Sequence, residues 1–188
     1  MRKFLLPLLA TAALVTPAAA AAHGWHHHHH ALAKLSGTGT SFANATATAS
    51  GQIVRSEKLG LGTFAASLAT DWSKATTRTG ERGTLSCAPA TATLTLTGAN
   101  VANTASASLT GKTCTFTKTD GTVVRGFLGR GTATGTGTLS ALTTAKAFLV
   151  QRSDGTVRGA VFGGRKDAEG TRLTFATALS FGEHHCDR

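Results

Sequence analysis

The sequence predicts an all-β domain: a single antiparallel meander closed into a small up-and-down β-barrel, with a β-sandwich as the alternative. Three observations support this fold class. Threonines alternate with apolar residues along several segments, two Asp-Gly pairs separate strand-like runs, and no segment after residue 36 has the apolar period of a helix. Closure into a barrel would also remove the exposed edges that threonine-rich strands otherwise present.

Strand alternation is clearest in the middle of the chain. Residues 90–97 place threonines on one face and alanine or leucine on the other, and residues 113–117 repeat the pattern. Threonine in strict alternation is typical of a half-buried antiparallel strand. We expect the remaining strands, in chain order, at residues 37–50, 52–59, 61–72, 83–87, 104–110, 132–139, 145–151 and 171–181.

Two Asp-Gly pairs mark hairpin turns between these strands. Asp120-Gly121 and Asp154-Gly155 each sit between strand-like runs, and both residue types tolerate positive φ. The flanking sequences, Thr-Asp-Gly-Thr-Val-Val-Arg-Gly and Ser-Asp-Gly-Thr-Val-Arg-Gly, are nearly the same, which predicts one structural unit used twice, with a repeated binding motif as the alternative. Several glycines of the later strands suit bends and bulges at barrel corners: Gly126, Gly129, Gly131, Gly135, Gly137, Gly159 and Gly163.

The N-terminus has the organisation of a secretory signal. Arg2 and Lys3 precede an apolar stretch, and small residues follow up to Ala22. We therefore expect a secreted protein with a signal peptide at 1–22, a flexible His-rich tail at 23–36, a β domain at 37–182 and a polar tail at 183–188. No later segment is long and apolar enough to predict a membrane span.

All eight histidines lie near the two ends of the chain, and none lies between residues 31 and 183. Imidazole and thiolate are ligands of copper, nickel and zinc, so this distribution predicts transition-metal binding. A purification tag and an incidental low-complexity tail are the alternative interpretations of the histidine run. The predicted metal ligands are His23, His26, His27, His28, His29, His30, His184, His185 and Cys186.

The position of signal cleavage decides what His23 offers a metal. Cleavage after Ala20 leaves Ala21-Ala22-His23, whose amine, amides and imidazole suit square-planar copper or nickel. Cleavage after Ala22 makes His23 the first residue, and His23-Gly24 then resembles the start of the copper-dependent polysaccharide monooxygenases. That resemblance implies a second histidine from the folded body, which this body lacks.

A barrel topology would bring the two clusters together. The first and last strands of an even-stranded up-and-down barrel pair antiparallel, so the chain enters and leaves at the same end. We expect the histidine run before the first strand and the Glu183–Cys186 segment after the last to lie near one another.

The three cysteines predict one disulfide and one additional thiol, because exported proteins meet an oxidising environment. Cys87 and Cys114 lie in strand-like segments, and their pairing is the preferred bridge. Pairing of Cys186 with either of them is the alternative, and it would remove Cys186 as a metal ligand.

Charge and composition favour binding over catalysis. The formal net charge is +10, or +8 without Arg2 and Lys3, which favours anionic partners. No histidine in the body is placed to act as a catalytic base, so we expect no enzyme and no catalytic residues. Nucleic-acid recognition is not expected, because the phenylalanines are interpreted as core and there is no tyrosine. The alternative function is an extracellular module that binds an anionic surface polymer, or a small apolar ligand in a cavity among small core side chains.

Overall fold

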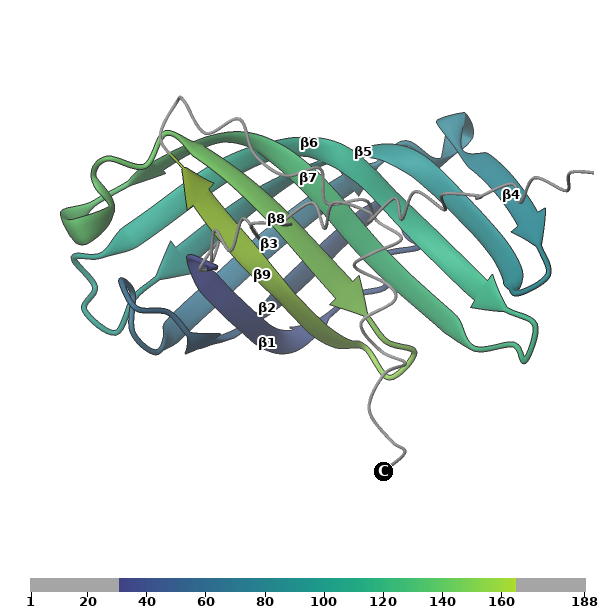
Figure 1. Ribbon diagram of the computed structural model, residues 1–188, viewed down its shortest axis with the longest axis horizontal. Coiled ribbons are helices and arrows are strands. Elements are labelled where there is room, and N and C mark those ends of the chain that lie inside the picture. The colour runs from purple at the N-terminus through teal and green to yellow at the C-terminus, as the bar shows by residue number, and fades with distance from the viewer. Residues whose placement is uncertain (1–30, 165–188) are drawn as a thin grey trace, which may run out of the picture.

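The computed structural model describes residues 31–164, which form nine strands and two short 3-10 turns (Figure 1). Their bounds, in chain order, are β1 (Ala33–Gly39), β2 (Thr46–Arg55), β3 (Gly62–Thr70), η1 (Trp72–Lys74), β4 (Thr76–Gly80), β5 (Gly83–Thr97), β6 (Thr104–Lys118), β7 (Val123–Gly135), η2 (Gly137–Leu139), β8 (Thr144–Gln151) and β9 (Thr156–Gly164).

Eight of these strands close into an antiparallel barrel. Consecutive strands pair with one another except β3 and β4, β1 pairs with β9, and β3 pairs with β5 to close the sheet. The ninth strand, β4, pairs with β5 outside the closed ring and lies at the right of Figure 1. The predicted all-β barrel is therefore confirmed, with one strand added outside it.

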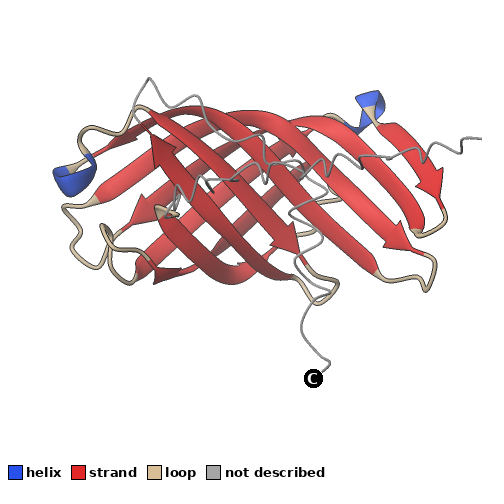
Figure 2. Cartoon of the chain, viewed as in Figure 1, coloured by secondary structure: helices blue, strands red, loops and turns tan. Residues whose placement is uncertain are grey.

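The barrel has two distinct ends. At the terminal end, both ends of the described chain meet the connections 56–61, 98–103 and 136–143. At the hairpin end lie the β1–β2 loop, η1 and the two Asp-Gly turns. Figure 2 shows η1 and η2 at opposite ends of the barrel.

Pro89 explains why β3 and β4 are separate strands. Both pair with the same edge of β5, β3 with Ala90–Thr97 and β4 with Gly83–Cys87. Between them the Asp71 amide donates to the Pro89 carbonyl at 2.9 Å, but proline has no N–H for the reciprocal bond. The chain leaves the ladder there as η1 and resumes as β4.

Several strand boundaries differ from the predicted ones. Residues 37–50 are not one strand, because 40–45 form a loop between β1 and β2, and β1 starts earlier, at Ala33. The segments predicted at 83–87 and 90–97 are joined in β5, and those at 104–110 and 113–117 in β6. The strand predicted at 171–181 lies outside the described residues.

The two Asp-Gly hairpins have the same geometry, as their sequences predict. Gly121 and Gly155 have φ of +82° and +80°, and each glycine amide donates to the carbonyl three residues earlier. The aspartates keep negative φ and instead accept from the amide two residues on, Asp120 from Thr122 and Asp154 from Thr156, both at 2.8 Å. These backbone hydrogen bonds lower the pKa of both carboxyl groups.

The barrel interior is filled with small side chains rather than hollow. Alanines and leucines from the other barrel strands, with Val157 and Val161 of β9, point inward and are buried, and the void between Leu94, Ala105 and Val161 measures about 10 Å³. Neighbouring strands approach one another closely at glycines, which have no side chain. If Gly111 carried a Cβ, that atom would lie 1.9 Å from the Leu128 carbonyl oxygen. Among the described residues, small inward side chains let the strands close inward and leave little free volume between Leu94, Ala105 and Val161.

Loop residues close both ends of this core. Leu59 and Leu139 are buried at the terminal end, and Phe42 is fully buried at the hairpin end. Gln151, itself 2% exposed, fixes the loop around Phe42. Its Oε1 accepts from the Phe42 amide at 2.9 Å, and its Nε2 donates to the carbonyls of Gly39 at 3.1 Å and Thr40 at 2.8 Å.

Candidate functional site

The predicted metal ligands lie outside the part of the chain that the structure describes. These are His23, His26, His27, His28, His29, His30, His184, His185 and Cys186. Within residues 31–164, no three His, Cys, Asp or Glu side chains form a group able to hold a metal ion.

The points where the terminal segments join the barrel are neighbours. Ala33 of β1 lies opposite Val161 of β9, and the antiparallel register continues from there to Thr38 and Thr156. Ala31, which directly follows His30, and Gly164 are therefore at the same end of the barrel. The strand predicted at 171–181, directly before Glu183, lies outside the described residues, so its position relative to β1 stays a prediction.

A shallow pocket of about 320 Å³ lies at this terminal end. Leu32, Leu139 and Leu142 form its apolar wall, and Glu57 and Lys58 add charged groups. Ala31 and Gly164, the first and last described residues, also line it.

The predicted disulfide is present. Cys87 of β5 and Cys114 of β6 are directly opposite in register and joined by a disulfide, 27 residues apart in sequence. It lies where β4 has replaced β3 as the partner of β5. Cys186, which lies outside the described residues, is not part of this bridge.

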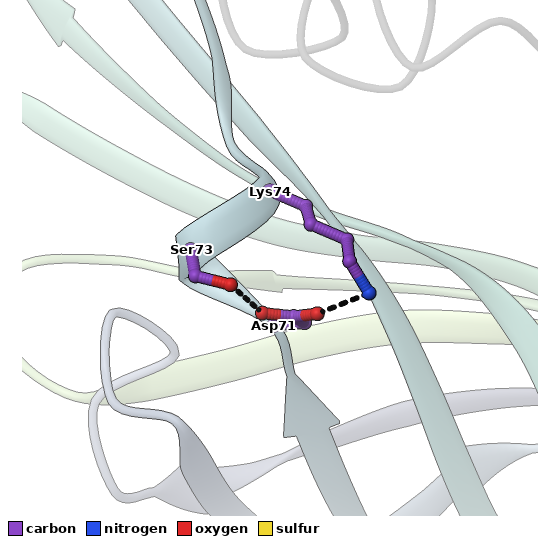
Figure 3. A network of polar contacts seen from close by, with 3 residues as sticks. All are labelled: Asp71, Ser73 and Lys74. Carbon is purple, nitrogen blue, oxygen red and sulfur yellow. Dashed lines mark hydrogen bonds and ion pairs between the residues drawn. The ribbon is translucent and has the colours of Figure 1, made fainter.

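Asp71 is held by contacts within its own turn (Figure 3). The Ser73 hydroxyl donates to one carboxylate oxygen at 2.5 Å, and the Lys74 ammonium lies 2.9 Å from the other. The Ser73 hydrogen bond, followed by Lys74, lowers the pKa of Asp71, and Asp71 raises the pKa of Lys74. The Trp72 indole donates to the Asn44 carbonyl, so this exposed group ties η1 to the β1–β2 loop.

Acidic and basic residues are distributed differently over the barrel. None of the nine strands contains Asp or Glu, and every acidic residue between 31 and 164 lies in a turn or loop. Basic residues lie within several strands: Lys34, Lys112, Arg130, Lys146 and Arg158 stand at outward positions of β1, β6, β7, β8 and β9, and Arg55 in β2 and Arg78 in β4 are also exposed. The outward positions of β3 and of Ala90–Thr97 in β5 carry only Thr, Ser and Ala.

Strand register places these cations around an apolar centre. One row across the barrel runs Lys112, Leu128, Phe148, Ala160, Lys34, from β6 through β7, β8 and β9 to β1. The row on one side runs Arg130, Lys146, Phe162, and the row on the other runs Gly126, Val150, Arg158. We call this surface the basic-apolar face: a centre of the partly exposed Leu128, Phe148, Val150 and Phe162, with Ala160 buried between them, surrounded by Lys34, Lys112, Arg130, Lys146 and Arg158.

Two aromatic rings lie in the centre of the basic-apolar face. Phe148 and Phe162 stand on adjacent strands with ring centroids 6.3 Å apart and planes inclined by 29°. Both are partly exposed on the outside of the barrel, so the interpretation of the phenylalanines as core is wrong for these two. It holds for Phe42, Phe64 and Phe127.

A signal for this face was present in the sequence. Along β8, Ala145, Ala147 and Leu149 alternate with Lys146, Phe148 and Val150, so both faces of the strand carry apolar side chains. A strand that is apolar on its outward face is typical of a surface with a partner.

No helix within residues 31–164 is long and apolar enough to cross a membrane. Comparisons with models of protein families, with curated proteins and with solved structures each found no significant match to this chain.

Proposed function

We propose that the chain is a secreted, non-catalytic binding protein that holds copper, nickel or zinc through its terminal His/Cys clusters. The observation that carries this proposal is the antiparallel pairing of β1 with β9. It anchors the segment that ends at His30 and the segment that begins at residue 165 at neighbouring points of one rigid barrel.

The two terminal segments join the barrel at neighbouring points, so each terminal His/Cys cluster has a raised effective concentration near the other. Two ligand-bearing segments tethered a short distance apart share a small volume, which favours their joint binding of one ion. Imidazoles from the first segment and the His184, His185 and Cys186 side chains from the second then complete a coordination shell that neither supplies alone. The barrel's role in this proposal is to hold the two anchors together.

Calorimetric titration of copper(II), nickel(II) and zinc(II) into the mature protein tests the proposal, with the N-terminus identified by mass spectrometry. We expect submicromolar binding. Two variants should each weaken it: serines in place of His26 to His30, which keep the chain length, and His184→Ala with His185→Ala and Cys186→Ala.

Other results would contradict this function. If only the serine variant loses binding, the N-terminal run binds alone and the joint site is wrong. Weak binding of all three ions by the unmodified protein would overturn the metal function altogether.

A second candidate function is the binding of an anionic partner through the basic-apolar face. It is supported by the placement of five cations around one surface whose strands lack Asp and Glu. Cations gathered on one side of a molecule attract polyanions more strongly than the same charges spread evenly. The packed interior gives no comparable support to binding of a small apolar ligand inside the barrel.

A further inference from the structure

The basic-apolar face combines two kinds of contact that one ligand rarely uses together. Its cations come from five different strands, and four of them, Lys34, Lys112, Arg130 and Arg158, are exposed. Its centre is aliphatic and aromatic. Adjacent strands are about 4.8 Å apart, so the row from Lys112 to Lys34 puts a cation on each flank of three successive apolar positions.

The convex shape of the barrel makes this centre accessible to a flat partner. β8 and β9, which carry Phe148, Val150, Ala160 and Phe162, cross the front of the barrel in Figure 1. On a convex surface the middle strands approach a flat partner first, and the flanking strands β6 and β1 follow with Lys112 and Lys34.

We propose that the basic-apolar face docks on anionic lipid bilayers. This inference deepens the second candidate function and rests on it, because it names the anionic partner. Phe148, Phe162 and Leu128 enter the boundary between headgroups and acyl chains, and the surrounding Lys and Arg side chains contact lipid phosphates.

The apolar centre is the reason to favour a lipid surface over a charged polymer. A polyanion would satisfy the cations and leave Leu128, Val150 and the two stacked phenylalanines in water. A bilayer satisfies both, since burial of apolar side chains adds to the attraction of anionic headgroups. Uncharged bilayers offer only the burial of apolar side chains. Binding should therefore require anionic lipid and should weaken as salt screens the charges.

Vesicle co-sedimentation of the full mature protein tests this docking. The vesicles contain equal parts of phosphatidylcholine and phosphatidylglycerol, with pure phosphatidylcholine as the comparison. We expect binding to the anionic vesicles only. The variant Lys34→Ala/Arg158→Ala should weaken partitioning about 20- to 30-fold, because each cation near an anionic surface contributes about fivefold.

The matched control removes the same charge elsewhere. Arg78 in β4 and Arg82 in the following turn are exposed and lie outside the basic-apolar face. Arg78→Ala/Arg82→Ala should change partitioning less than about threefold. A third variant, Phe148→Ser/Phe162→Ser, keeps every charge and should weaken binding about tenfold or more. Thermal unfolding of each variant verifies that the barrel is intact.

Several outcomes would overturn the inference. If Lys34→Ala/Arg158→Ala and Arg78→Ala/Arg82→Ala weaken vesicle binding equally, binding depends on net charge and not on the basic-apolar face. Unchanged binding by the phenylalanine variant would remove the apolar centre from the site. Dimerisation through Phe148 and Phe162 without vesicle binding, seen by light scattering, would assign the face to a second copy of the chain.

A soluble polyanion separates this inference from the function on which it rests. If dextran sulfate binds through Lys34 and Arg158 but anionic vesicles do not bind, the lipid assignment is wrong and the anionic-partner function stands. If neither binds, both are wrong.

Discussion

Gln151 shows how one buried polar side chain determines the shape of a loop. The Gln151 side-chain amide accepts one hydrogen bond from the backbone of residues 39–42 and donates two to it. These bonds hold the loop in a conformation in which Phe42 packs against the end of the barrel core. A buried amide of this kind is stabilising only while its partners stay in place. The loop, and not a continued strand, is therefore the stable state of residues 40–45.

Replacement of Gln151 should show this dependence. Gln151→Leu keeps the approximate volume but leaves the Phe42 amide and two carbonyls without partners, so we expect the free energy of unfolding in urea to fall by about 2–4 kcal/mol. Gln52→Leu, at an exposed outward position of β2, is the control and should change it by less than about 0.5 kcal/mol. Equal effects in the two variants would mean that the hydrogen bonds of Gln151 do not hold the loop.

The disulfide acts at the scale of the strands. Cys87 and Cys114 join β5 and β6 beyond the closed part of the barrel, where the outer edge of β5 is held only by the short strand β4. Closing a loop of this length restricts the unfolded chain, which stabilises the folded state by about 3–4 kcal/mol in the chain-entropy account.

Removal of both cysteines tests this contribution. Cys87→Ala/Cys114→Ala should lower the free energy of unfolding by about 3–4 kcal/mol in urea denaturation. Cys186→Ala is the control, because Cys186 is outside the bridge, and it should leave the value unchanged. A double variant as stable as the unmodified protein would show that β4 and the surrounding packing suffice to hold this end of the sheet.

Charge is a property of the whole molecule. The formal net charge is +10, the strands contain no Asp or Glu, and Arg130 lies directly opposite Lys146. Like charges on paired strands repel one another, and salt reduces the repulsion once the Debye length is shorter than the separation of the charges. The gathered charge that suits an anionic partner is therefore unfavourable for the isolated barrel.

This trade-off predicts an unusual salt response. An increase from about 0.02 M to about 0.5 M sodium chloride should raise the Tm, and Arg130→Gln should raise it at low salt and reduce the salt dependence. Arg78→Gln, which removes one charge outside the basic-apolar face, should have a smaller effect in calorimetry. A Tm that falls with salt would show that favourable ion pairs outweigh the repulsion.

How far the sequence predicts this molecule differs from element to element. The Asp-Gly hairpins were predictable because glycine alone takes the positive φ of these turns, whatever surrounds them. The Cys87–Cys114 bridge was predictable because both cysteines stand in alternating strands. The loop at 40–45 was not, because its conformation depends on Gln151, more than 100 residues away in sequence.

Local sequence was sufficient to predict the fold class, the hairpin turns and the disulfide. Each follows from local periodicity or from turn chemistry. The tertiary structure was needed to show that small side chains pack closely inside the barrel and that Phe148 and Phe162 lie outside it. The tertiary structure also places Lys and Arg side chains from five strands around those two rings. Such features depend on which residues stand opposite one another across the sheet, and register is set by closure of the whole barrel.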